Sequence, residues 1–376
     1  MSLATPRPKP KRSSPTKLAT FYVVRGSAEI RWRVELPVRH LKAGLVSMNK
    51  ASALSLRQPE YKSGLQWRQS EEGAEYPEHE GVAVWTRPCM LRAIHAAAMS
   101  ANGIRTLAEV DDNYLSDPNQ NIFMRINGFD RRTRQSHLQA FASFDGIVYS
   151  TEWLRDEYTR VFKKELHTAP EGFVARNHVD IADWELPDGK CRVPIVGGER
   201  ARIRVGWMGS HQHVWDLRLA APALRLAKDL GCEVVLIGLD PANHDPHWRD
   251  FLGDYTYVPF CKPTRYHKTY VDVDIGLIPL VYNKHTLGKS DVKFLEYSMS
   301  GVATVAQNSP VYNKTIIHGE TGLLAGSPDE MALQMADLVK HSRQRRELAQ
   351  AAKQWVLENR RMSREGVSEW RAALEG

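Results

Sequence analysis

The sequence predicts an α/β protein built from two domains, each with a parallel sheet that is covered by helices on both faces. Short apolar stretches alternate with longer amphipathic ones, which is the pattern of a parallel sheet with crossover helices. The alternation runs twice, before and after a polar stretch rich in proline and glycine at residues 183–201. At 376 residues, the chain is long enough for two separate cores.

The composition is that of a soluble globular protein. Apolar residues make up 42% and charged residues 25% of the chain. The apolar runs are too short for a membrane span, and the first residues carry no hydrophobic signal core. The cysteines Cys89, Cys191, Cys232 and Cys261 form no CxxC pair, which argues against a zinc site or a disulfide framework. We therefore expect a cytoplasmic protein.

Much of the positive charge lies in residues 1–18. This stretch holds five lysines and arginines and no acid, and removing these five from the formal net charge of +7 leaves +2 for the rest. A leader rich in proline, serine and lysine is most simply a disordered basic tail. It could also make weak contacts with nucleic acid or an anionic membrane.

The first domain is expected over residues 19–182. Its strands are expected in the runs ATFYVV, GVAVWTRP, IRTLAEV and DGIVYS, at residues 19–24, 81–88, 104–110 and 145–150. Helical spacing is found at residues 30–44, at 89–103, in a stretch through Phe141 and at 151–164. Gly44 and Gly103 end two of these helices.

The second domain is expected over residues 202–345, after the linker at 183–201. Its strands are expected in RIRVGWMG, CEVVLIG, DIGLIPL and VATVA, at residues 202–209, 232–238, 274–280 and 302–306. Helices at 214–231 and 291–300 end at Gly231 and Gly301. Ser327, Pro328 and Glu330 form a capping box with proline at the first helical position. Residues 346–376 are expected to be C-terminal helices that pack back toward the N-terminal domain.

Ligands of open α/β sheets bind beyond the carboxyl ends of the strands, where each strand leads into a helix. The first such junction of the second domain is GWMGSHQH, at residues 206–213. Gly209 allows a ligand to approach the backbone, Ser210 can donate a hydrogen bond, and the next helix presents its positive end. The stretch is neither a GxGxxG nor a Walker motif, and a tight turn explains it equally well.

The second junction, GKSDVKFLEY, carries two lysines where the helix dipole is already positive. With Ser290 as N-cap, Lys289 lies just outside the helix and Lys293 one turn inside it, on the same face. A bound diphosphate would compensate, because two phosphates outweigh an unfavourable dipole energy of about 0.5 kcal/mol per lysine. Glu296 could accept hydrogen bonds from ribose or sugar hydroxyls. Alternatively, Asp291 and Glu296 pair with the lysines on a solvated face.

A third junction follows the strand VATVA. In QNSPVYN, Ser309 is expected as N-cap and Pro310 as the first helical residue, so this helix also aims free N–H groups at the crevice. Three junctions suited to anions in one domain favour a nucleotide diphosphate as the ligand.

The stretch DIGLIPL…LGKSDVKFLEYSMSGVATVAQNSPVYN…HGETGLL resembles the donor-binding domain of GT-B glycosyltransferases, specifically the retaining family 4 with its "glycosyl transferases group 1" domain. The resemblance covers residues 202–340 well, and the first domain more loosely in RGSAEIRWRVELP, DGIVYSTEWL and NHVD. It implies a GT-B fold, with two Rossmann-like domains facing each other across a cleft. It also implies transfer of a sugar from a UDP- or GDP-sugar, with retention at the anomeric carbon.

Glu296 matches the second glutamate of the family's E-x7-E motif, which holds the donor's ribose in similar enzymes. The first glutamate falls on Gly288. The arginine that usually follows the glycine of the second domain's first strand is replaced by Trp207. Lys289 and Lys293 are therefore expected to replace the missing cations. The resemblance also implies a set of donor-binding residues at the three junctions: Gly209, Ser210, His213, Ser309, Val311 and Tyr312.

The first domain should supply the acceptor side. Gly26 follows the first strand, like the glycine-bearing loop that approaches the donor phosphate in similar enzymes. Asp111 and Asp112 end another strand and could orient an acceptor hydroxyl or a sugar, or cap the next helix. Adjacent carboxylates repel each other unless something offsets them, which favours function. Asp272 and Asp274 spell the DxD of metal-dependent GT-A enzymes, but Asp274 opens an apolar strand, so we expect no catalytic metal.

We therefore expect a hexosyltransferase of bacterial or phage type that needs no cofactor beyond the nucleotide sugar. Asp111, Asp112, Lys289 and Lys293 are the expected catalytic residues. Lysines and helix N-termini would stabilise the departing diphosphate, which can itself take the acceptor's proton. The acceptor stays open among a saccharide, a lipid, a protein and DNA. The alternatives are a phage-type enzyme that glycosylates hydroxylated DNA bases, a nucleotide-sugar epimerase of the same fold, and a non-catalytic nucleotide-sugar binder.

Overall fold

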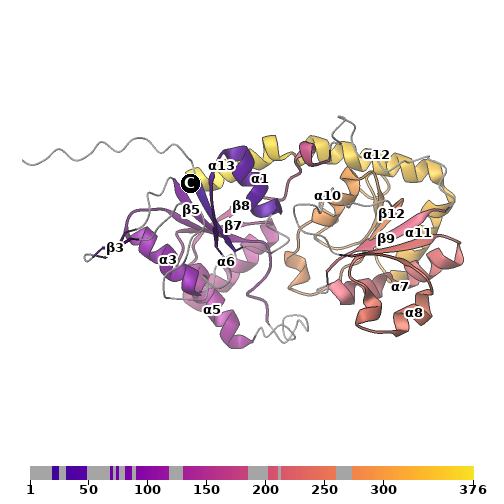
Figure 1. Cartoon of the computed structure of the whole chain (residues 1–376), viewed down its shortest axis with the longest axis horizontal. Coiled ribbons are helices and arrows are strands. Elements are labelled where there is room, and N and C mark those ends of the chain that lie inside the picture. Colours follow the sequence, from indigo (N-terminus) through magenta and orange to yellow (C-terminus); the bar gives the residue numbers. More distant parts are fainter. Residues whose placement is uncertain are drawn as a thin grey trace, which may run out of the picture.

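The computed structural model describes residues 19–24, 31–48, 68–70, 73–75, 81–86, 90–117, 130–184, 202–210, 213–259 and 273–376. These residues form two α/β domains that lie side by side along the molecule (Figure 1). Each domain contains a six-stranded parallel sheet, which confirms the predicted fold class. The leader, residues 1–18, and most of the predicted linker lie outside the described residues.

The N-terminal sheet has the strand order β2-β1-β5-β6-β7-β8. Its strands are β1 (Ala19–Val24), β2 (Gly44–Met48), β5 (Val82–Thr86), β6 (Thr106–Val110), β7 (Gly146–Tyr149) and β8 (Glu171–Val174). Every described position of β6 and β7 is buried, as expected for strands that are covered on both faces. Because all neighbouring strands of this sheet pair in parallel, their carboxyl ends point in one direction. A separate antiparallel pair, β3 (Arg68–Ser70) and β4 (Gly73–Glu75), was not predicted.

Helices cover both faces of this sheet. One face packs against α3 (Met90–Ala101), α5 (Arg131–Ala142) and α6 (Glu152–Leu166), where Trp85 and Tyr149 join the core. The opposite face packs against α1 (Leu36–Leu41) and the last helix of the chain, α13 (Val367–Glu375). The helix predicted at residues 30–44 ends earlier than expected. It stops at Leu41, because Lys42 adopts a left-handed conformation and β2 begins at Gly44.

The C-terminal sheet has the strand order β11-β10-β9-β12-β13-β14. Its strands are β9 (Arg204–Met208), β10 (Glu233–Gly238), β11 (Thr256–Pro259), β12 (Ile275–Ile278), β13 (Ala303–Gln307) and β14 (Leu323–Ala325). Asp274 accepts a hydrogen bond from the backbone N–H of Arg204 at 2.8 Å, which is the structural role expected for it. Asp272 lies outside the described residues.

The helices of this domain are α7 (Val214–Asp229), α8 (His247–Leu252), α10 (Val292–Met299), α11 (Pro328–Lys340) and α12 (Ser342–Asn359). One face of the sheet packs against α7, α8, α11 and the start of α12, and the other packs against α10 and the later part of α12. Ser327 caps α11 by accepting from the Glu330 N–H at 3.1 Å, as the sequence predicted.

The chain returns to the N-terminal domain at its end. In Figure 1, α12 lies along the C-terminal domain and α13 lies on the N-terminal sheet. Trp370 packs edge-to-face on Phe21, with ring centroids 5.3 Å apart, and Arg105 donates to the carbonyl oxygen of Leu374 at 2.9 Å. The C-terminal residues thus join both domains.

Candidate functional site

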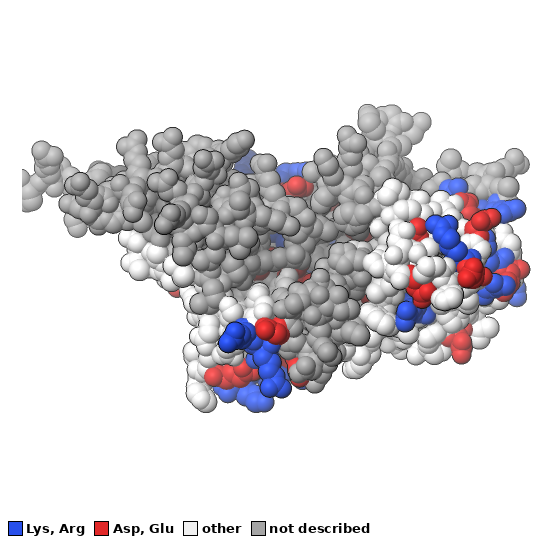
Figure 2. Space-filling model, turned by 60° about the horizontal axis from the view of Figure 1, so that its bottom comes forward, with Lys and Arg blue, Asp and Glu red and all other residues white. Residues whose placement is uncertain are grey.

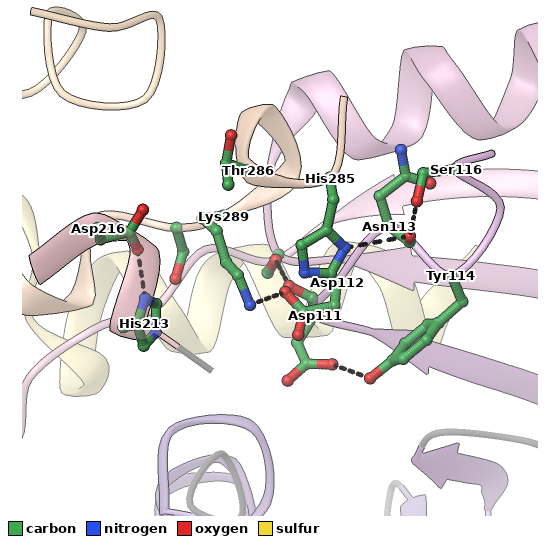
Figure 3. A network of polar contacts seen from close by, with 12 residues as sticks. Asp111, Asp112, Asn113, Tyr114, Ser116, His213, Asp216, His285, Thr286 and Lys289 are labelled. Atoms are coloured by element: carbon green, nitrogen blue, oxygen red, sulfur yellow. Dashed lines mark hydrogen bonds and ion pairs between the residues drawn. The ribbon is translucent and has the colours of Figure 1, made fainter. Parts of the chain in front are cut away.

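The segments that follow the carboxyl ends of the strands in the two sheets meet between the domains. Lys289, just before α10, forms an ion pair with Asp112, which follows β6, with 2.6 Å between Nζ and Oδ1. The next residue, Asn113, donates from its amide to the carbonyl oxygen of Lys284 at 3.0 Å. Figure 3 shows Lys289 between this N-terminal segment and the pair formed by His213 and Asp216. The predicted carboxylate and the predicted lysine therefore meet directly.

Gly288 has a steric role in this interdomain contact. A Cβ atom at this position would lie 2.8 Å from Leu154 Cδ2 and 3.2 Å from Asn113 Cβ, and both partners belong to the other domain. Such distances are too short for carbon atoms, so a side chain would force the domains apart locally. The close approach of the N-terminal domain therefore explains the glycine at this position.

We predict that Gly288→Ala lowers the free energy of unfolding by about 1–3 kcal/mol, the usual cost of overpacking. Gly326→Ala is the matched control, because a Cβ there would meet only the flexible carboxylate of Glu330, at 3.2 Å. Thermal unfolding of the two variants compares them. Equal melting temperatures for the two variants would show that the contact at Gly288 can relax without cost.

The second group of charges lies at the start of α7 and on α10. Burial, together with the nearby Lys293 ammonium, lowers the pKa of His213 to about 4. His213 Nδ1 lies 2.6 Å from Asp216 Oδ2. The hydrogen bond from His213 helps to hold the pKa of Asp216 low despite burial, so the carboxylate stays charged and Nδ1 carries the proton. At neutral pH, His213 is therefore a neutral side chain that is held in place by Asp216.

Lys293 is the second cation of this group. Its side chain is partly buried, and its Nζ lies 5.7 Å from the centre of the Trp207 ring. Burial lowers the pKa of the Lys293 ammonium to about 8, while the Asp216 carboxylate acts in the opposite direction. Lys289 also lowers it, so the two ammonium groups are close enough to repel each other. A site with two neighbouring cations favours binding of an anion.

The start of α10 differs from the prediction. Its N-cap is Asp291 and not Ser290, and the Asp291 side chain makes no capping hydrogen bond to the helix. Ser290 Oγ instead accepts a hydrogen bond from Asn177 of the N-terminal domain at 2.8 Å. Asp291 forms a buried ion pair with Arg360 and accepts from Thr315 at 2.8 Å. The carboxylate that could have neutralised the lysines is therefore engaged elsewhere.

The third junction also differs from the prediction. Residues 309–315 form turns, so Ser309 and Pro310 do not begin a helix. Ser309 and Tyr312 are buried in these turns, and burial raises the pKa of the Tyr312 hydroxyl well above its usual value. Val311 is partly exposed and lines a cavity between the domains. The anion-binding helix N-terminus expected here is absent from the described residues.

The remaining predicted residues lie in different environments. Gly209 packs against the Trp207 indole, which a Cβ would meet at 2.6 Å, and Ser210 is partly exposed beside it. Glu296 is almost fully buried, at 1% exposure. Asp111 accepts a hydrogen bond from the Tyr114 hydroxyl at 3.2 Å. Gly26 lies outside the described residues.

Several polar residues of the site escaped the sequence analysis. Asn113, Asn177 and His285 join the two domains, and His285 Nδ1 lies 3.4 Å from the carbonyl oxygen of Asn113 (Figure 3). Asp216 has the signal that could have revealed it, since it follows His213 by one helical turn and faces the same side. The asparagines have no such local signal.

Comparisons with known proteins agree with this architecture. Residues 218–365 match a family described as glycosyl transferase-like. Sucrose-phosphate synthase from Thermosynechococcus elongatus is similar in structure, with a TM-score of 0.62 and 10% identity, over 96% of this chain and 98% of that chain. HepE from Anabaena, solved with UDP and glucose, is similar with a TM-score of 0.63 and 12% identity, over 95% of this chain and 100% of that chain. No protein with a curated description matches significantly.

Among the described residues, no helix combines the length and the apolar character that a bilayer crossing requires. The similar structures are GT-B glycosyltransferases, which confirms the resemblance that the sequence showed. This chain therefore has the GT-B fold, and its residues 218–365 match the glycosyl transferase-like family.

Proposed function

We propose that this protein transfers a sugar from a nucleotide-diphosphate sugar to an acceptor hydroxyl, and that Lys289 and Lys293 bind the diphosphate of the donor. The observation that carries the proposal is the placement of these two ammonium groups. They lie at the carboxyl ends of the strands of the glycosyl transferase-like domain, beside the start of α10. A diphosphate bound there would relieve their mutual repulsion.

The proposal assigns different roles to the two lysines. Lys293 lies against Trp207 and beside Asp216, where it can bind a phosphate in a partly desolvated place. Lys289 is shared with Asp112, so the diphosphate competes with a carboxylate for its ammonium. Gly209, Ser210 and Val311, which are partly exposed, would surround the donor. Ser309 and Tyr312 would contact it only after a local rearrangement, because both are buried. A ribose contact to Glu296 requires a local rearrangement, because its carboxylate is buried.

The reaction that we propose is retaining and independent of a metal. In a front-face transfer, a departing diphosphate stabilised by the lysines accepts the proton of the incoming hydroxyl. UDP-glucose is the first donor to test, because the HepE structures contain UDP, glucose and UDP-glucose. We expect the enzyme to release UDP or GDP from its donor in the presence of EDTA, and NMR of the product should show the anomeric configuration of the donor. An inverted product, or activity that EDTA abolishes, would contradict this part of the proposal.

The affinity for a nucleoside diphosphate should depend on the protonation of Lys293. Its pKa is about 8 in the free protein, and a bound diphosphate stabilises the ammonium and raises that pKa. Above pH 8, binding must therefore take up a proton, and the affinity should fall by up to about tenfold per pH unit. Titration calorimetry from pH 7 to 9.5 measures this, because the terminal phosphate, with a second pKa of about 6, is mostly ionised at pH 7 and fully ionised above pH 8. Uridine without phosphates, and the variant Lys293→Met, should lack the slope.

The alternative functions make different predictions. On the face that Figure 2 shows, Lys and Arg side chains lie next to Asp and Glu on both domains, and this mixed face gives no specific support to a DNA acceptor. Deletion of residues 1–18 tests the basic leader, since DNA retention that depends on it should weaken and become less sensitive to salt.

An epimerase would convert the nucleotide sugar without an acceptor. A binding protein would neither transfer nor hydrolyse it.

A further inference from the structure

His213 and Asp216 form a pair at the start of α7 that uses only one nitrogen of the imidazole ring. His213 is the N-cap of this helix, and Asp216 lies one turn further along it. The ring donates from Nδ1 to Oδ2 of Asp216, with 2.6 Å between the two atoms. A neutral imidazole has one donor nitrogen and one acceptor nitrogen. Nε2 is therefore the acceptor.

The Asp216 carboxylate is held at both of its oxygens. Oδ2 accepts from His213, and Oδ1 accepts from the backbone N–H of Val281, in the segment after β12, at 2.7 Å. Asp216 is only 4% exposed. Because a buried carboxylate with both oxygens engaged cannot turn away, it fixes the tautomer and the orientation of the His213 ring.

Nε2 of His213 is accessible to a ligand beside the proposed diphosphate site. The side chain is 19% exposed, and within the described part of the chain Nε2 has no hydrogen-bond partner. Burial, followed by the charges of Lys293 and Lys289, lowers the pKa of His213, so the ring lies close to both ammonium groups. Figure 3 shows Lys289 next to His213. A ligand that binds the two lysines through its diphosphate thus brings its neighbouring groups within reach of His213.

The lone pair of Nε2 determines which kind of group can bind there. Phosphate oxygens of a diphosphate carry lone pairs and no proton, so they repel an acceptor nitrogen. A protonated His213 could bind them, but Lys289 and Lys293 already match the charge of the diphosphate in a nucleotide sugar. A hydroxyl group supplies the proton that Nε2 lacks. A nucleotide sugar carries hydroxyl groups on both sides of its diphosphate, on the ribose and on the transferred sugar.

We propose that His213 accepts a hydrogen bond from a hydroxyl group of the nucleotide sugar, and that Asp216 is the positioning residue that keeps Nε2 free of a proton. This rests on the proposed function and assigns a specificity-determining contact to the same site. A ligand that lacks this hydroxyl leaves Nε2 without a partner in the complex, so the protein discriminates against it. The two lysines bind the diphosphate of every nucleotide sugar, whereas His213 selects those with a hydroxyl at one position.

The test compares ligands that differ by one hydroxyl group, using the full chain and titration calorimetry. The ligands are UDP-glucose, its 2′-deoxyribose analogue and analogues that each lack one hydroxyl of the glucose. GDP-mannose and its deoxy analogues form a second series. We expect one deoxy compound to bind about 3- to 10-fold more weakly than its parent. In His213→Phe, which keeps an aromatic ring and lacks Nε2, parent and deoxy compound should bind equally. The identity of that compound distinguishes the ribose from the transferred sugar.

Asp216→Asn tests the positioning role. The amide of an asparagine can either accept from Nδ1 or donate to it, so His213 can place its proton on Nε2. The affinity ratio between parent and deoxy compound should therefore fall. Long-range proton–nitrogen NMR should show that the single Nδ1–H tautomer of the wild type is lost. The ratio is the relevant quantity, because removing a charge near Lys293 affects all diphosphates alike.

His341→Phe and Asp337→Asn are the matched controls. Nδ1 of His341 lies 2.9 Å from Oδ1 of Asp337, but this pair is exposed at the end of α11, with 58% and 50% side-chain exposure. Both variants should keep the affinity ratio of the wild type. A ratio that is the same in wild type and His213→Phe for every deoxy compound would overturn the proposal.

Two further results have different consequences. NMR of the complex that shows both ring nitrogens of His213 protonated would also contradict the proposal, because the ring would then bind phosphate as a cation. An unchanged ratio in Asp216→Asn would contradict the positioning role of Asp216. If no nucleoside diphosphate and no nucleotide sugar binds at all, the proposed function itself is wrong.

Discussion

Lys293→Met should weaken the binding of UDP by about 10- to 150-fold and leave the binding of uridine unchanged. A hydrogen bond to a charged partner contributes about 1.5–3 kcal/mol, and every 1.4 kcal/mol is a tenfold change in affinity. We expect Lys293 to contribute more to phosphate binding than Lys289, because its ammonium lies partly buried near Trp207 and Asp216. Titration calorimetry at pH 7 measures both affinities.

The ranking of variants makes this prediction sharper. Lys289→Met should cost less than Lys293→Met, because Asp112 already shares the Lys289 ammonium. Asp112→Asn should release that ammonium and strengthen UDP binding. Lys340→Met on α11 is the matched control, since this lysine is exposed at the end of that helix. Equal losses for UDP and uridine in the Lys293 variant would contradict the assignment of the phosphates.

Arg33→Met should lower the free energy of unfolding by about 3–5 kcal/mol, the largest stability effect that we expect. Arg33 and Glu109 are almost completely buried, at 1% and 0% side-chain exposure, and Arg33 Nε lies 2.6 Å from Glu109 Oε1. Removing the guanidinium leaves a buried carboxylate without its cation. Glu109 lies at the end of β6, so this pair also supports the segment that carries Asp111 and Asp112. Urea unfolding measures the effect.

Two further variants test the cause of that effect. The double variant Arg33→Met, Glu109→Leu should recover most of the stability, because a buried apolar pair can replace a buried ion pair. Arg39→Met removes an exposed arginine that pairs with Asp180, and should cost less than about 1 kcal/mol. If the double variant is no more stable than Arg33→Met, the loss comes from packing and not from the uncompensated carboxylate.

The sequence predicted features that depend on local pattern. Fully buried strands such as β7 and β12 have continuous apolar runs. The capping box at Ser327 also depends on neighbouring residues alone. Lys289 and Lys293 stood out because they oppose the dipole of their own helix. Short edge strands were harder to predict: β8 and β14 have few residues, and β8 is only partly buried.

The contacts between the domains could not be predicted from one sequence. Asn113 bonds to a residue 171 positions away, and Asn177 to one 113 positions away. Ser290 looked like a helix cap because its local context fits that role, but a distant asparagine uses its hydroxyl. Gly288 likewise looked like a lost glutamate until its distance from Leu154 gave it a steric role. Such pairs are determined by the tertiary fold and leave no local signature.

The most direct test of the central claim is a crystal structure of the protein in complex with UDP or GDP. The account predicts a diphosphate at the start of α10, with phosphate oxygens about 2.7–3.2 Å from the Nζ atoms of both Lys289 and Lys293. The Asp112 carboxylate should then share Lys289 or release it. A nucleotide bound elsewhere, with Lys289 still paired only to Asp112 and Lys293 still lying against Trp207, would contradict it.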